Sequence, residues 1–186
     1  MRTFIAIPIP EKIKQYADRV RKELNTGKPD VKWVEYANYH LTLKFLGDID
    51  LQLNQNIREK MYLIGESCPS FEFNIKGLGF FPNKTRPRVI WLGIEGEMDK
   101  ADFLGERIDS YLCPLGFEPE KRRSFHLTIG RVRSDSGLDE LVEKAAAINK
   151  ENSTPPFRVK TFNLMESKLS PGGPRYEVIE TFVLNG

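Results

Sequence analysis

Two short segments, each built around a histidine, contain the residues best suited to chemistry. His40 stands in the sequence YHLTL and His126 in the sequence FHLTI, and the chain has no other histidine. Each histidine follows an aromatic residue and precedes a leucine, a threonine and an aliphatic residue. Alternate side chains of a strand share a face, so each histidine projects together with the threonine two residues later, Thr42 or Thr128.

A histidine beside a threonine, present twice, suits chemistry at a phosphate group. The attacking and leaving oxygens lie on opposite sides of the phosphorus, so a base is needed on one side and an acid on the other. An unperturbed imidazole pKa of about 6.5 allows one ring to be neutral and the other protonated near neutral pH. The threonine hydroxyls can donate hydrogen bonds to the non-bridging oxygens, where negative charge develops. We therefore expect His40 and His126 to form an acid–base pair around one phosphate.

Two other interpretations of the histidines are open. A lone histidine on a half-buried strand is more often structural than catalytic, although two in matching contexts favour a shared function. Zinc could bind both histidines together with Cys68 and Cys113, but these four positions lack the usual ligand spacing, and the cysteines give no disulfide framework. No glycine-rich dinucleotide or P-loop pattern occurs. We predict no metal site and no cofactor.

The similarity between the two segments extends along the whole chain. A strand-like apolar run begins 36 residues before each histidine, at Phe4 and at Ile90. Another strand-like run begins 31 residues after each histidine, at Phe71 and at Phe157. Equal spacings over such a distance indicate an internal duplication.

Hydrophobic periodicity predicts the elements of the two repeats. The predicted strands are 2–9, 31–34, 40–48, 71–75 with an extension toward a proline-rich turn, 89–94, 125–133, 157–166 and 176–184, and the predicted helices are centred on 13–24, 53–64, 98–112 and 138–148. We expect Asp135 or Ser136 to cap the last helix. Helices that alternate with pairs of strands favour an α+β fold with mainly antiparallel sheets. We expect a single domain, residues 1–186, of two pseudo-symmetric lobes (repeats at about 1–88 and 89–186) with helices outside and a central cleft.

The composition is that of an ordinary globular protein. The 186 residues are 40% hydrophobic and 29% charged, and 28 basic against 26 acidic side chains give a net charge of +2, too small to predict a nucleic-acid partner. Residues 118–133 are locally basic, with five basic and two acidic residues, so an RNA backbone would favour the second repeat. The chain lacks a long apolar run and a secretory signal, so we expect a cytoplasmic protein without a membrane segment.

The two histidine motifs resemble those of the two-histidine phosphoesterase superfamily, and most closely those of the RNA 2′,3′-cyclic phosphodiesterase family, formerly called 2′-5′ RNA ligase. The resemblance is carried by HLTLKFLG (40–47), HLTIGRV (126–132), RTFIAI (2–7), RVIW (88–91) and ESKL (166–169). It implies hydrolysis of an RNA terminal 2′,3′-cyclic phosphate to a 2′-phosphomonoester without a metal.

The resemblance also implies a role for each motif residue. His40 would donate a proton to the departing 3′ oxygen, and His126 would accept a proton from the attacking water. Thr42 and Thr128 would hold the phosphate. The implied partner is RNA with a 2′,3′-cyclic phosphate end, tRNA fragments being one candidate, or a nucleotide, and we expect a monomer. Two alternatives are open: a ligase that joins RNA ends through 2′-5′ bonds, and a module that binds a nucleotide or RNA without turnover.

Two further positions are candidate substrate contacts. The family pattern points to Arg131 as a contact to phosphate or base, although strict alternation places it on the face opposite His126. A bulge at Gly130 could turn Arg131 toward the site. Phe45 holds the equivalent position in the first repeat; a place in the core is the expectation, and stacking on a nucleobase is the alternative.

Overall fold

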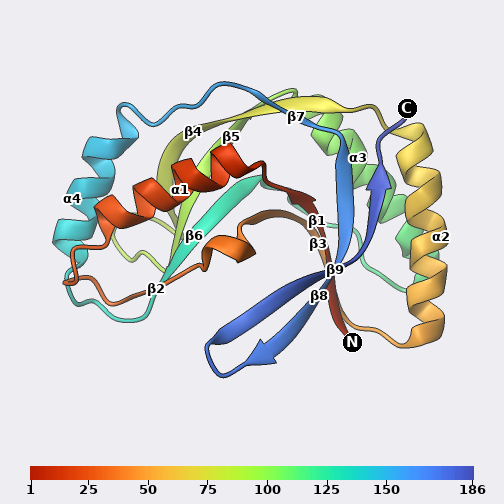
Figure 1. Cartoon of the computed structure of the whole chain (residues 1–186), viewed down its shortest axis with the longest axis horizontal. Coiled ribbons are helices and arrows are strands. Elements are labelled where there is room, and N and C mark those ends of the chain that lie inside the picture. The colour runs from red at the N-terminus through yellow and green to blue at the C-terminus, as the bar shows by residue number, and fades with distance from the viewer.

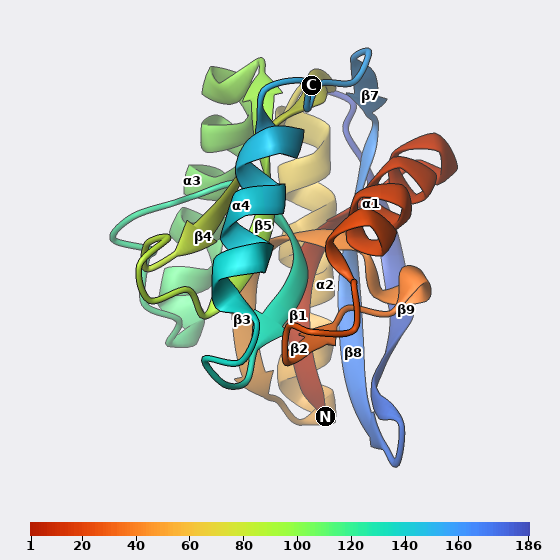
Figure 2. The same ribbon diagram turned by 90° about the vertical axis from the view of Figure 1, so that its left-hand side faces the viewer.

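The computed structural model describes all residues, 1–186, as two antiparallel sheets with four α-helices outside them (Figures 1 and 2). The elements are β1 (Arg2–Pro8), α1 (Glu11–Leu24), β2 (Val31–Trp33), the 3-10 turn η1 (Tyr36–Asn38), β3 (His40–Asp48), α2 (Leu51–Ser67), β4 (Phe71–Phe81), β5 (Val89–Gly96), α3 (Met98–Leu112), η2 (Cys113–Leu115), β6 (His126–Val132), α4 (Leu138–Asn149), β7 (Phe157–Val159), β8 (Thr161–Ser170) and β9 (Gly173–Val183). One sheet has the order β3-β1-β8-β9 and the other the order β2-β6-β5-β4-β7. All strand pairs are antiparallel, which confirms the predicted α+β class.

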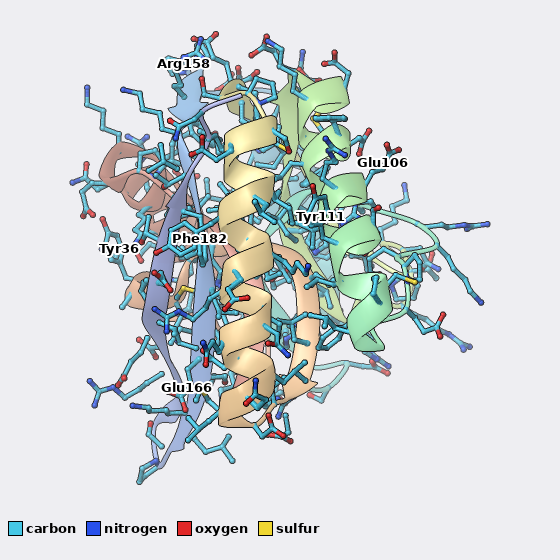
Figure 3. All side chains as sticks on the ribbon, turned by 90° about the vertical axis from the view of Figure 1, so that its right-hand side faces the viewer. Tyr36, Glu106, Tyr111, Arg158, Glu166 and Phe182 are labelled. Carbon is cyan, nitrogen blue, oxygen red and sulfur yellow. The ribbon has the colours of Figure 1, made fainter.

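Each sheet combines strands from both halves of the chain. The four-stranded sheet joins β1 and β3 to β8 and β9, and the five-stranded sheet inserts β4 between β5 and β7. The helices also contact elements from the other half of the chain: α1 contacts α4 and β6, whereas α2 contacts α3 and β9. Figure 3 shows α2 in front, with β9 on one side of it and α3 on the other. A single cluster of 38 buried residues forms the core, so the two halves are interlaced, and the repeat boundary near residue 88 stays a prediction.

The two histidine strands contain the same irregularity at the same place. In β3, Leu43 lies between two residues that pair with neighbouring residues of β1, so Leu43 itself has no partner. In β6, Ile129 is left out of the pairing with β5 in the same way. Both are β-bulges three residues after the histidine, and each reverses the alternation of faces beyond it, in β3 as far as a second irregularity at Leu46.

Two details of the predicted elements are wrong. The predicted strand 157–166 is two strands, because β7 pairs with β4 whereas β8 pairs with β1, and the chain passes between the sheets at Lys160. Neither Asp135 nor Ser136 caps α4; its N-cap is Gly137, with φ of +68° and no side-chain hydrogen bond. A Cβ on Gly137 would lie 2.6 Å from the backbone of Lys28, so this close approach, together with the left-handed φ, requires glycine.

Candidate active site

The two predicted His–Thr pairs lie on β3 and β6, strands of different sheets that contact each other. Both histidines are half-buried. Nε2 of His40 lies 3.0 Å from the Thr42 hydroxyl, which confirms that these two side chains lie together. His126 and Thr128 pair with alternate residues of β5, so they also share one face of their sheet.

The His40 ring is fixed on several sides. Its Nδ1 donates a hydrogen bond to the Asn38 carbonyl at 2.6 Å, which leaves Nε2 toward Thr42. The ring centroid lies 4.9 Å from that of Phe4 and 5.0 Å from that of Tyr176, which meets it nearly edge-on at 85°. Burial lowers the pKa of His40 below its ordinary value of 6.5; the Asn38 carbonyl opposes this shift, and the Lys14 ammonium adds to it.

The His126 ring has a matching environment. Phe81 meets it edge-on, with centroids 5.0 Å apart and an interplanar angle of 83°. Burial lowers the pKa of His126, the Ser124 carbonyl raises it, and the Arg131 guanidinium lowers it further. The buried Nδ1 of His126 forms no hydrogen bond within normal geometry, in contrast to the Nδ1 of His40. In both motifs the carbonyl that faces the ring belongs to the residue two positions before the histidine.

Each histidine packs against one aromatic ring from the opposite half of the chain. Tyr176 of β9 packs against the histidine of the first repeat, and Phe81 of β4 packs against the histidine of the second repeat. Neither ring could be identified from the sequence, because no spacing signal indicates that β4 and β9 cross to the other repeat's sheet. These contacts limit the rotation of each imidazole.

The bulges place Arg131 and Phe45 on the histidine faces. Arg131 and Thr128 pair with alternate residues of β5, Val89 and Trp91, so Arg131 is turned to the His126 face, as the bulge hypothesis predicted. The extra residue is Ile129 rather than Gly130. Phe45 has the equivalent position in β3 and is 71% exposed, so the expected core position is wrong. The reason is the same: strict alternation fails beyond a bulge.

A buried ion cluster connects β3 to the segment that leads into β6. The Lys44 ammonium lies 2.7 Å from the Asp109 carboxylate and donates to the Glu118 carbonyl at 2.6 Å. The Arg123 guanidinium pairs with the same carboxylate and donates to the Leu43 carbonyl at 3.1 Å. Arg123 is therefore occupied inside the protein, which corrects the expectation that all the basic residues of 118–133 are available to RNA.

A pocket of about 350 Å³ adjoins the His40 side of the site. It lies between η1 and the β8–β9 hairpin, which extends away from the rest of the molecule in Figure 1. Its lining residues are Glu35, Ala37, Asn38, Ser170, Gly172, Gly173, Pro174, Arg175 and Tyr176. Asn38 and Tyr176 both contact His40, so these two residues separate the pocket from the imidazole, which does not itself line it.

No three His, Cys, Asp or Glu side chains are grouped as ligands of a metal ion. The two cysteines weighed as zinc ligands are both free; Cys68 is buried and Cys113 exposed. None of the α-helices is both long and apolar enough to cross a membrane.

The arrangement of sheets and helices is shared with solved structures of other proteins. The crystal structure of TT0787 from Thermus thermophilus has a TM-score of 0.81 and 25% sequence identity, with 100% of this chain and 99% of that chain covered. Escherichia coli LigT, solved in complex with 3′-AMP, has a TM-score of 0.76 and 21% identity over 100% of this chain and 98% of that chain. The fold and the doubled His–Thr site thus define a two-histidine protein of LigT architecture.

Sequence comparison identifies the family. The model of the family described as LigT-like phosphoesterase matches residues 7–91 and again residues 94–176. The RNA 2′,3′-cyclic phosphodiesterase of Thermotoga maritima is 37% identical over 182 residues, which cover 96% of this chain and 93% of that protein. The RNA 2′,3′-cyclic phosphodiesterase of Methanothermobacter thermautotrophicus is 34% identical over 185 residues, 99% of both chains. The chain belongs to the LigT-like phosphoesterase family, which confirms the family that the two motifs predicted.

Proposed function

We propose that this protein hydrolyses the terminal 2′,3′-cyclic phosphate of RNA to a 2′-phosphomonoester. The observation that carries the proposal is the pair of matched His–Thr motifs on two contacting strands, each imidazole packed edge-on against an aromatic ring. The relatives from Thermotoga maritima and Methanothermobacter thermautotrophicus are named for this reaction. The fixed rings suit an acid and a base that act on opposite sides of one phosphorus.

In this reaction His40 is the proton donor. Its Nδ1–H is held by the Asn38 carbonyl, which stabilises the positively charged ring and leaves Nε2 to release a proton to the departing 3′ oxygen. Burial lowers the pKa of His40 and so makes its imidazolium a stronger acid. The Thr42 hydroxyl, beside Nε2, is placed to hydrogen-bond a non-bridging oxygen of the same phosphate.

His126 is the proton acceptor. It takes a proton from water as the water oxygen bonds to phosphorus and the bond from phosphorus to the 3′ oxygen breaks. Thr128 lies on the same face and supplies a second hydroxyl to the non-bridging oxygens. Arg131 adds positive charge on this face, and the exposed ring of Phe45 offers a surface on which a nucleobase can stack. No step requires a metal ion.

Product analysis tests the proposal. A short RNA that ends in a 2′,3′-cyclic phosphate is incubated with the protein, with and without EDTA, and the terminal phosphate is located by NMR. We expect a 2′-phosphate and the same rate in EDTA, because histidines perform both proton transfers. Formation of a 3′-phosphate, or loss of turnover in EDTA that added metal restores, would contradict the mechanism.

The same assay separates the two alternative functions. Addition of RNA with a free 5′-hydroxyl end, such as the matching half of a split tRNA, allows a 2′-5′ joined product to form if the protein is a ligase. Tight binding of the cyclic-phosphate RNA without any product would indicate a binding module instead. Both intact His–Thr pairs favour turnover over binding alone.

The pH dependence of hydrolysis follows from the two lowered pKa values. The donor must be protonated, so activity falls as pH rises above its pKa, and the acceptor must be neutral, so activity falls as pH drops below its pKa. Burial lowers the pKa of both rings below 6.5. We expect kcat/KM, measured from pH 4.5 to 9, to pass through a maximum below pH 6.5. A maximum above pH 7 would contradict a lowered pKa for at least one of the two rings.

A further inference from the structure

Two positively charged side chains face each other on the His126 face of the five-stranded sheet. Lys32 of β2 pairs with Arg131 of β6 in the antiparallel register, so their side chains lie on the same face. Neither forms an ion pair with an acidic side chain. Like charges directly opposite each other on paired strands are destabilising, and an anion bound between them removes this repulsion.

The ammonium group of Lys32 also reaches the pocket beside His40. Its Nζ lies 3.5 Å from the position that a Cβ on Gly173 would take, and Gly173 lines the pocket. Lys32 thus extends from the sheet of His126 to the hairpin that holds Tyr176 against His40. The pocket, at about 350 Å³, is within the size range of small-ligand sites.

Charged side chains of both signs lie at the pocket: Glu35 and Arg175 line it, and Lys32 approaches it at Gly173. Glu35 lines it and would repel a phosphate, but its carboxylate can accept hydrogen bonds from the hydroxyl or amino groups of a nucleoside. An anion is therefore favoured between Lys32 and Arg131, beside the pocket, and a nucleoside within the pocket, where Glu35 can accept its hydrogen bonds. One phosphate next to one nucleoside is the repeating unit of RNA.

We propose that Lys32, together with Arg131, binds the 5′ phosphodiester that joins the terminal nucleotide to the rest of the RNA, and that the pocket receives the adjoining nucleoside. This inference rests on the proposed function. A strand that ends in a cyclic phosphate continues only through its 5′ oxygen, so a phosphate held beyond the reacting one belongs to that linkage. The subsite would make the enzyme prefer RNA ends to free cyclic nucleotides.

Two substrates that differ in this linkage test the proposal. One is adenosine 2′,3′-cyclic phosphate, and the other is the adenylyl dinucleotide that ends in a 2′,3′-cyclic phosphate. We expect Lys32→Ala to lower kcat/KM for the dinucleotide about tenfold, the effect of one charged hydrogen bond, and to leave the mononucleotide within about twofold. The slope of log kcat/KM against log salt for the dinucleotide should become shallower by about 0.7, as expected for one lost phosphate contact to a single strand.

Two further variants serve as controls. Lys32→Arg keeps the charge and should retain the preference for the dinucleotide. Lys144→Ala removes an exposed lysine of α4 that has no ion pair, and it should change neither substrate. Equal losses for both substrates in Lys32→Ala, or no loss for either, would refute the subsite while the proposed function stands. If the unaltered protein turned over neither substrate, the proposed function would fall, and the subsite with it.

Discussion

Replacement of His40 or of His126 by alanine is expected to lower kcat for cyclic-phosphate hydrolysis by about 10²–10⁴-fold, the contribution of one general acid or base. Both rings are half-buried and packed against aromatic residues, so each variant also needs a thermal unfolding measurement to show that the protein remains folded. A folded variant with activity within a few-fold of the unaltered protein would remove that histidine from the mechanism.

A modified substrate separates the two roles. In a cyclic phosphate with sulfur in place of the 3′ oxygen, the leaving group is a thiolate, whose conjugate thiol has a pKa of about 8.5 and needs little help from an acid. The sulfur substrate should therefore recover most of the activity lost in His40→Ala and little of that lost in His126→Ala. Equal recovery in the two variants would contradict the assignment of donor and acceptor.

Replacement of Asp109 by alanine is expected to lower the free energy of unfolding strongly. The change leaves the Lys44 ammonium, whose side chain is 2% exposed, and the Arg123 guanidinium without their shared carboxylate. Removal of one partner from a buried ion pair typically costs about 3–5 kcal/mol. For a chain of this size each kcal/mol lowers Tm by about 2–4 °C, so calorimetry should record a decrease of roughly 6–20 °C.

Asp102→Ala is the matched control for this experiment. Asp102 lies on the same helix, α3, but is exposed and forms no ion pair, so its replacement should change stability by less than about 0.5 kcal/mol. If the two variants unfolded at the same temperature, the buried cluster would not contribute to stability as argued.

The period-2 pattern of a strand was sufficient to predict where the His–Thr pairs lie, because both pairs precede the bulges. Beyond Leu43 and Ile129 the same rule gives the wrong face, since a bulge is a property of two paired strands and not of one segment. In the second repeat, Gly130 indicated locally that the strand contains a bulge. The first repeat has Lys44 at that position, and nothing in its neighbourhood indicated that this lysine is buried.

The groups that orient the histidines could not be predicted, because they depend on which strands become neighbours. Tyr176 and Phe81 reach the rings only through the exchange of hairpins between the halves of the chain. Asp109 pairs with Lys44 because α3, from the second half, packs on the side of β3 that faces away from His40. Hydrophobic periodicity indicates which face of a helix or strand is buried, but it does not indicate which other element covers that face.

The large sequence separation between β1 and β3 on one side and β8 and β9 on the other has a consequence for synthesis on the ribosome. β1 emerges first, yet one of its two neighbouring strands is β8, with Thr3 opposite Glu166. Contacts so distant in sequence form late in folding, because a long loop must close before they contribute. His40 gains its Tyr176 contact only after β9, far beyond β3 in the sequence, has been translated. A nascent chain that ends before β9 should therefore lack the contact that fixes the His40 ring.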